Sequence, residues 1–176
     1  MRIRVTWFLL LAGLLAGGVP PAAAQDAPRP AEETLELWNH TAERVVALAE
    51  NFPEDKYDFK ASPEVRSFRE QLLHVAGANY FFLQRAGSKK TKAEHAGRET
   101  KADVVAVVKE SFADGAAFIR DSGDDGLRRM VKHPLAERNV SIQTLLLVAT
   151  NHAGEHYGQL VVYYRLNGIV PPASRR

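Results

Sequence analysis

The sequence predicts an all-α fold, a four-helix bundle. Four segments of about twenty residues each carry apolar residues at helical spacing. The residues at the ends of these segments are those that start and stop helices, namely serine, threonine, glycine and proline. No segment shows the apolar and polar alternation of a half-buried strand. Four helices of this length, each with an apolar face, are expected to pack as one bundle.

The first 24 residues differ from the rest and predict a signal peptide. Arg2 and Arg4 give a positive start, an apolar run follows over residues 5–19, and Ala22-Ala23-Ala24 closes the segment after two prolines. This order is typical of a secretory signal cleaved after Ala24. A transmembrane anchor is the alternative, but the apolar run is shorter than the roughly 20 residues that cross a bilayer. We expect a secreted or periplasmic protein without a membrane partner after cleavage.

The first helix of the bundle is expected over residues 31–51. Its apolar positions at helical spacing are Leu35, Trp38, Val45, Val46 and Leu48. Phe52 and Pro53 end it, because a proline disfavours helical backbone in the residue before it. The preceding residues 25–30 are rich in proline and alanine, and we expect them to form a flexible lead-in.

The second helix is expected to begin at Ser62 and Pro63. Serine is a favoured N-cap, and proline fits the first helical position because the N–H that it lacks has no helical partner there. The helix is expected to continue to about Arg85, where Gly87 stops it.

The third helix is expected to open at Thr100, because Asp103 three residues later resembles a capping box. It should run to about Asp121, before the glycine-containing break that starts at Gly123.

The fourth helix is expected to begin at about Asn139 or Ser141 and to end at Asn167. Gly168 follows it directly and two prolines stand just beyond, which is a common stop signal. The bundle is therefore expected over residues 31–172, with residues 173–176 as a short tail.

The connection between the second and third helices is long enough to allow these two helices to run parallel. Residues 86–99 are rich in lysine and glycine, and fourteen residues are many for a loop between antiparallel neighbours. A twenty-residue helix is about 30 Å long, whereas fourteen extended residues span roughly 45 Å. The connection can therefore return along the bundle as a crossover. The second and third helices could therefore be parallel.

Charge and cysteine content exclude several classes of function. The chain has 23 basic and 21 acidic residues, and removal of Arg2 and Arg4 with the signal leaves 21 of each. A near-neutral mature protein lacks the basic surface that nucleic-acid binding requires, so no nucleic-acid partner is expected. The chain has no cysteine, which excludes disulfides, a thiolate nucleophile and thiolate metal ligands. Any metal site must use imidazole, carboxylate or water.

His152 and His156 are the strongest candidates for chemistry. They lie four residues apart on the fourth helix, so their side chains stack on one face. The same face carries the apolar residues Leu145, Ala149, Leu160 and Tyr163. Two imidazoles in a buried stripe need polar partners, and a divalent cation such as Zn or Ni satisfies both. The alternative is a pair of core histidines that are hydrogen-bonded to other helices.

The five residues from His152 to His156 also have the H-x-x-E-H spacing of inverzincin peptidases, in which the glutamate is the general base. Such a site needs a third ligand, usually a carboxylate well downstream. The twenty residues after His156 contain no Asp or Glu, which argues against a peptidase. Glu155 remains a candidate base, or a group that supports a ligand.

Two stretches of the sequence resemble the DinB-like family. One is the last helix, with His152-Ala-Gly-Glu-His156 followed by Tyr-Gly-Gln159. The other is residues 65–79 of the second helix, which include Gln-Leu-Leu-His74. In helix number and order the resemblance covers essentially the whole mature chain. It implies a four-helix bundle in up-down-down-up order, with a metal held by three histidines that map to His74, His152 and His156.

The third ligand rests on this resemblance alone. On a helical wheel His74 lies roughly opposite the densest apolar stripe of its helix. That stripe is formed by Phe68, Leu72, Val75 and Leu83. His74 shares its own face with Gln71, Ala78 and Phe81. A surface histidine would have the same pattern, so the helical wheel leaves both placements open.

Two classes of function follow. Three neutral imidazoles leave a fourth position open on Zn or Ni, the arrangement of a catalytic site. The chain is then a metal-dependent hydrolase or, as the resemblance implies, a thiol-dependent transferase, acting on a small molecule with Glu155 or Gln159 assisting. Export disfavours the transferase, because low-molecular-weight thiols are kept reduced inside the cell.

The other class is a non-catalytic metal-binding or stress-related bundle, and the resemblance adds a homodimer as a candidate assembly. The two classes differ in access to the metal. A pocket over the open metal position favours an enzyme, whereas a site sealed by Trp38, Phe81 or Tyr163 favours the non-catalytic protein.

Overall fold

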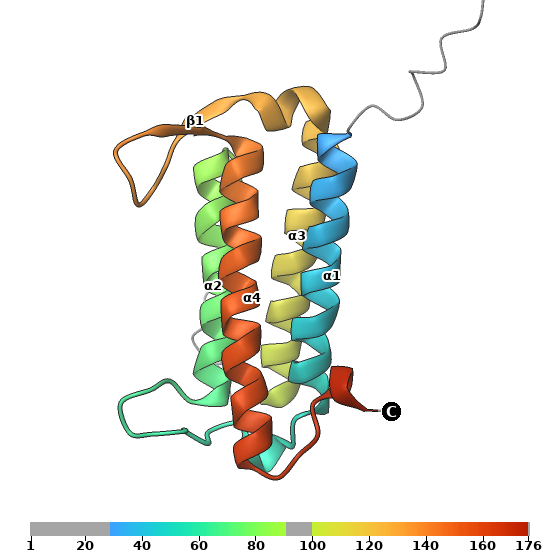
Figure 1. Cartoon of the computed structure of the whole chain (residues 1–176), viewed down its shortest axis with the longest axis vertical. Helices are drawn as coiled ribbons and strands as arrows, with labels where there is room; N and C mark the ends of the chain where they lie inside the picture. Colours follow the sequence, from blue (N-terminus) through green and yellow to red (C-terminus); the bar gives the residue numbers. More distant parts are fainter. Residues whose placement is uncertain (1–28, 91–99, 176) are drawn as a thin grey trace, which may run out of the picture.

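The computed structural model describes residues 29–90 and 100–175 and shows an all-α protein, as the sequence predicted (Figure 1). Its four long helices are α1 (Pro30–Asn51), α2 (Phe68–Ala86), α3 (Lys101–Arg128) and α4 (Ile142–Leu166). The expected signal peptide and most of the expected lead-in lie outside the described residues. No described helix has both the length and the apolar character to cross a membrane.

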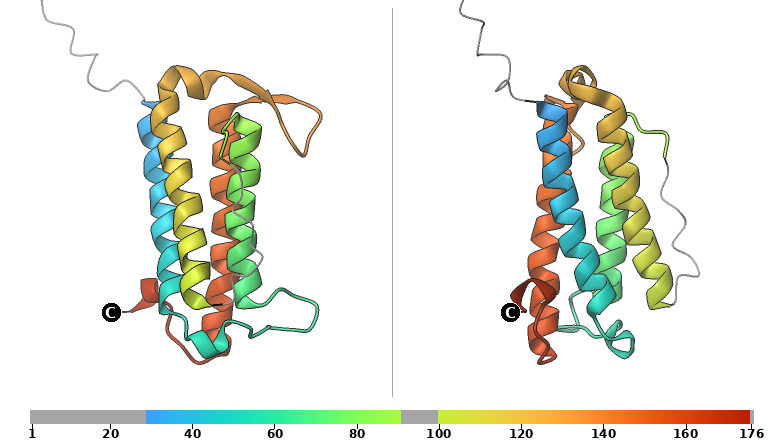
Figure 2. Two further views of the ribbon diagram at one scale, coloured as in Figure 1. Left: turned by 180° about the vertical axis from the view of Figure 1, so that it is seen from behind. Right: turned by 90° about the vertical axis from the view of Figure 1, so that its right-hand side faces the viewer.

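The helices form a four-cornered bundle in which each helix packs mainly against two others. α1 contacts α3 and α4, and α2 contacts the same two helices from the opposite corner. Figures 1 and 2 show that α2 and α3 run in one direction and that α1 and α4 run in the other. This is the predicted up-down-down-up order. It makes α2 and α4 antiparallel neighbours, which is the contact that builds the candidate site.

The chain between α2 and α3 must return along the bundle. α2 ends at Gly87, which has the left-handed backbone (φ 103°) that glycine adopts without strain. α3 begins at the opposite end of the bundle (Figure 1). The crossover is therefore confirmed by the directions of the two helices, although residues 91–99 lie outside the described part.

The predicted start of α2 at Ser62 and Pro63 is wrong by about one helical turn. The helix begins after Ser67, whose side chain accepts from the Glu70 amide while the Glu70 carboxylate accepts from the Ser67 amide. This reciprocal capping box satisfies two amides that would otherwise lack partners. Residues 60–67 instead fold back, with Lys60 bridged to Ser67.

α3 is longer than predicted. The expected break is present at Gly123, whose backbone is non-helical (φ 57°), but the helix resumes and continues to Arg128. The last turn of α3 caps the N-terminus of α1, because the Asp124 carboxylate accepts a hydrogen bond from the Ala31 backbone amide at 2.9 Å. The N-terminus of α1 is thus capped by another helix rather than by its own sequence.

A short hairpin links α3 to α4. Its strands are β1 (Met130–Lys132) and β2 (Asn139–Ser141), which pair antiparallel with Val131 opposite Val140. Ser141 then caps α4 by accepting from the Thr144 amide. The hairpin contacts α2 and lies over its C-terminal end (Figure 1).

An aromatic cluster at the other end of the bundle fixes α2 against α1 and α4. Phe52 stacks on Phe68 with ring centroids 3.9 Å apart, and Tyr164 packs on both rings. The buried Tyr164 hydroxyl donates to the Leu48 carbonyl at 2.6 Å. These contacts hold the start of α2 in register with the C-terminal end of α4.

Candidate metal centre

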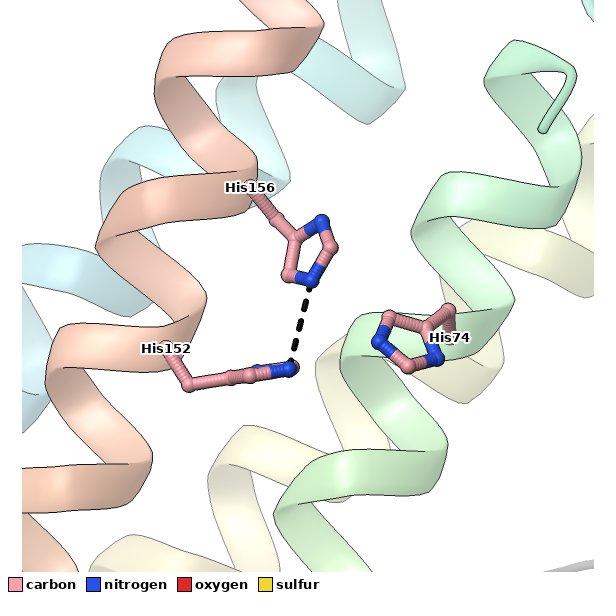
Figure 3. A group of neighbouring side chains, drawn as sticks. All are labelled: His74, His152 and His156. Carbon is pink, nitrogen blue, oxygen red and sulfur yellow. Dashed lines mark hydrogen bonds between the residues drawn. The ribbon is translucent and has the colours of Figure 1, made fainter. Parts of the chain in front are cut away.

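Three histidines meet between α2 and α4. His74 comes from α2, and His152 and His156 come from consecutive turns of α4 (Figure 3). Their ring centroids are 4.5 to 5.1 Å apart. One ring nitrogen from each histidine lies within 4.8 Å of the others. The structure thus brings together the three residues that the family resemblance indicated as ligands.

His74 faces α4 because α2 has two packed faces. The densest apolar stripe, with Leu72 and Val75, is fully buried in the core. A second stripe with Gln71 and His74 turns toward α4, where the Gln71 amide donates to Gln159 at 2.7 Å. A position opposite the main stripe is therefore an interface with α4, not free surface.

The two histidines of α4 already have the spacing of metal ligands. Their Nε2 atoms are 3.2 Å apart. An ion 2.0–2.1 Å from two imidazole nitrogens in tetrahedral geometry separates them by about 3.3 Å. A ring nitrogen of His74 lies within 4.8 Å of a ring nitrogen of each of the other two histidines. The donor set, three imidazoles from two rigid helices, fits a divalent ion such as Zn or Ni.

Gln159 sets the tautomer of His156. Its amide oxygen lies 3.0 Å from Nδ1 of His156 and also accepts from the buried Gln71. Because a carbonyl oxygen only accepts, Nδ1 of His156 must carry the proton. Nε2 then has a free lone pair that points at His152, which is the form of imidazole that binds metal.

Burial favours the neutral form of both histidines of α4. Loss of solvent lowers the pKa of His152 and of His156 below the ordinary value. The nearby His152 lowers the pKa of His156 further, while the Glu155 carboxylate raises the pKa of both rings. Nδ1 of His152 is buried and has no hydrogen-bond partner among the described residues. The polar contact of this ring is therefore at Nε2, on the side of His156.

The two candidate catalytic residues differ in position. Gln159 contacts His156 directly and therefore orients that ring. Glu155 lies on the exposed side of α4, where its carboxylate accepts from the Asn151 amide at 2.8 Å. Its charge still reaches the two rings, as their pKa shifts show. A role for either residue in proton transfer stays a prediction.

A pocket of about 330 Å³ opens beside the cluster. His74 and His152 form its polar edge. Its other walls come from α2 and the hairpin, and are formed by Leu73, Gly77, Ala78, Phe81, Phe82 and Leu135. Two of the three residues named above as possible covers lie elsewhere. Trp38 is buried against Phe112 of α3, and the Tyr163 hydroxyl donates to the Arg66 carbonyl.

The sequence did not identify two contributors to this site. The position of Gln71 could have been inferred from the sequence, because it lies three residues before His74 and therefore on the same face of the helix. No sequence pattern places Leu135 at the site, since it reaches the pocket through the hairpin that links α3 to α4.

Comparison with known families and structures agrees with this fold. Residues 37–160 match the family model of the DinB superfamily. No curated protein sequence matches the chain at a significant level.

Three solved structures are similar to the chain. A DinB-like protein from Bacillus cereus gives a TM-score of 0.72 at 16% identity, over 80% of this chain and 95% of that one. A DinB-like protein from Bacillus subtilis gives 0.63 at 20% identity, over 82% and 99%. YfiT from Bacillus subtilis gives 0.59 at 12% identity, over 79% and 88%. YfiT is described as a probable metal-dependent hydrolase with an unusual four-helix bundle topology.

Proposed function

Because the chain belongs to the DinB superfamily, we propose that His74, His152 and His156 hold a divalent ion, Zn or Ni, in a hydrolase that acts on a small molecule. The observation that carries the proposal is the pair of Nε2 atoms of His152 and His156, which lie 3.2 Å apart beside a pocket that His152 lines. The description of YfiT as a probable metal-dependent hydrolase supports it.

Each part of the centre has a separate task. The three imidazoles bind the ion, and Gln159 holds His156 in the tautomer that can bind. When bound, the ion supplies a Lewis acid that polarises a carbonyl and lowers the pKa of water. The pocket beside His74 and His152 admits the substrate. Hydrolysis needs no partner other than water, which suits an enzyme that works outside the cell.

Access to the site favours an enzyme over a non-catalytic metal protein. His74 and His152 are only partly buried, and both line the pocket. Phe81 forms a wall of that pocket and remains 37% exposed. A purely structural metal site is normally closed by protein ligands on all sides.

Metal titration tests the centre. Zinc or nickel added to the metal-free chain should bind with one equivalent by calorimetry, and His74→Ala, His152→Ala and His156→Ala should each weaken binding strongly. His40→Ala is the matched control, because His40 is exposed on α1. If His156→Ala keeps full affinity, the proposed centre is wrong. Hydrolysis of small chromogenic esters and amides should then require the metal in the unmodified chain.

We also propose export with cleavage after Ala24, on the pattern of the first 24 residues. Terminal sequencing of protein recovered from the native host should give a first residue near Gln25. Protein that begins at Met1 and stays in the membrane fraction would contradict export.

A further inference from the structure

The pocket beside the histidines is apolar except at one edge. His74 and His152 are the polar residues among those that line it. The remaining walls are aliphatic, aromatic or glycine: Leu73, Gly77, Ala78, Phe81, Phe82 and Leu135. A charged group placed here would lose its hydration without gaining a partner, except at the histidine edge.

The hairpin holds Leu135 over this pocket. The buried His133 ring accepts from the Leu135 amide at 3.1 Å, and the His133 amide donates to the Arg138 carbonyl at 2.9 Å. These bonds give the loop tip a defined shape. Leu135 is nevertheless 73% exposed, as a large apolar side chain without full cover. An occupant of the pocket would bury more of it.

The apolar pocket ends at a polar boundary. Arg85 lies over the outer pocket wall, with its guanidinium carbon 5.2 Å from the Phe81 ring centroid. Beyond Leu135 a second hollow of about 540 Å³ is polar, with Arg85, Lys132 and His133 among its lining residues. The apolar part of a ligand must therefore fit in the 330 Å³ between this boundary and the histidines.

We propose that the substrate carries a compact apolar body, the size of one or two aromatic rings, that fills this pocket while its polar reacting group lies at the histidines. The size follows from volume, since a cavity of roughly 150 Å³ holds one benzene ring. Leu135 and Phe81 then select for this body. This inference rests on the proposed metal centre for the position of the reacting group, but not for the apolar pocket.

Two hydroxamates test the inference, because a hydroxamate chelates zinc whatever body it carries. Phenylacetohydroxamate should bind the zinc-loaded chain at least about tenfold tighter than acetohydroxamate by calorimetry, since burial of roughly 60 Å² of apolar surface supplies that factor. Ala78→Phe, which fills the pocket, and Leu135→Ser, which removes an apolar wall, should each bring the ratio of the two affinities toward one. Leu166→Ser changes an exposed leucine elsewhere on α4 and should keep the ratio.

A second measurement separates this inference from the metal centre. Toluene titrated into the metal-free chain should shift the NMR amide signals of Ala78 and Leu135, and should do so equally in His156→Ala. Equal affinity of the two hydroxamates for the zinc-loaded chain would overturn the apolar pocket and leave the metal centre standing. Absence of zinc binding together with a toluene response would overturn the metal centre and leave the pocket.

Discussion

At the scale of single residues, the contact between α1 and α3 depends on a glycine. Trp38 is fully buried, and its indole N–H donates to the Phe112 carbonyl at 2.9 Å. A Cβ at Gly115 would lie 2.1 Å from the Trp38 ring. Real atoms cannot approach so closely, so the two helices can pack at this distance only with glycine at this position.

Gly115→Ala should therefore destabilise the bundle by about 1–3 kcal/mol, because overpacking forces the buried indole to move. Chemical denaturation measures the change. Gly158→Ala is the matched control on α4, where an added Cβ meets nothing within 4 Å. It should be neutral or stabilise by up to about 1 kcal/mol, since alanine is the better helix former. Equal stabilities of the two variants would contradict the packing described for Trp38.

The amide of Gln159 gives a second prediction at this scale. Gln159→Leu removes the acceptor that orients His156 and should weaken zinc binding roughly 10- to 100-fold. Gln159→Glu keeps an acceptor and should retain most of the affinity. The exposed Gln84 of α2 supplies a control, because Gln84→Leu should leave zinc binding unchanged. If both variants at Gln159 bind zinc equally well, this residue does not position His156.

The histidines show what sequence can predict about single residues. The four-residue spacing of His152 and His156 was sufficient to place their side chains on one buried face. The spacing around His74 was not sufficient to place its side chain. A helical wheel identifies the main apolar stripe of a helix, whereas α2 has two packed faces. Whether the second face meets a neighbouring helix depends on the packing of α4, which lies far away in sequence.

At the scale of elements, helix starts depend on which of several capping signals the backbone can use. The sequence offers both Ser62 with Pro63 and Ser67 with Glu70. The helix starts at the second of these signals, because both hydrogen bonds of that capping box form and because Phe68 then packs against Phe52 in the aromatic cluster. Propensity alone could not decide this choice, since it takes no account of the tertiary contact.

The capping difference can be measured. Ser67→Ala removes the acceptor for the Glu70 amide and should destabilise the protein by about 1 kcal/mol. Ser62→Ala should change the stability little, because the Ser62 hydroxyl donates to the exposed Glu64 side chain and does not cap the helix. Denaturation midpoints of the two variants provide the comparison. A larger loss for Ser62→Ala would place the functional start of α2 at the earlier serine.

The hairpin was not predicted, and its size explains why. Strands of three residues are too short to show alternation, and β1 and β2 together contain a single buried residue, Val140. Pairing of Val131 with Val140 is decided by how α3 and α4 end and begin, not by local pattern. The pocket that depends on Leu135 could therefore not be inferred before the structure.

At the scale of the whole molecule, the order of the helices brings the three histidines together. The length of residues 86–99 was enough to allow parallel α2 and α3, because chain reach is a simple geometric limit, and the family resemblance implied that order. With that order α2 lies beside α4 and antiparallel to it. His74 then meets His152 and His156 near the middle of both helices, where the backbone is rigid.

The same histidines make the stability of the metal-free protein depend on pH. Burial lowers the pKa of His152 and His156 in the folded state, so the unfolded chain takes up protons first as the pH falls. Their contribution to stability is present above the ordinary pKa of about 6.5. It is lost progressively as the pH falls through the lower folded-state values. Metal-free protein should therefore melt at a lower temperature at pH 5 than at pH 7.5.

Bound metal should enlarge this pH dependence. An ion that binds only the folded state stabilises it by about 2.7 kcal/mol at 100 times its dissociation constant. For a chain of this size that is a rise in melting temperature of roughly 5–10 °C. Protons compete with the ion for neutral imidazoles, so the rise caused by zinc or nickel at pH 7.5 should shrink near pH 5.

Scanning calorimetry with and without metal measures both effects. His156→Ala should abolish the rise at pH 7.5, and His40→Ala, at an exposed position on α1, should keep it. A rise of the same size at both pH values would mean that the ion binds carboxylates elsewhere on the surface. A full rise in His156→Ala would mean that the pair on α4 is packed core, because a site held by these imidazoles cannot lose its most buried ligand and keep its affinity.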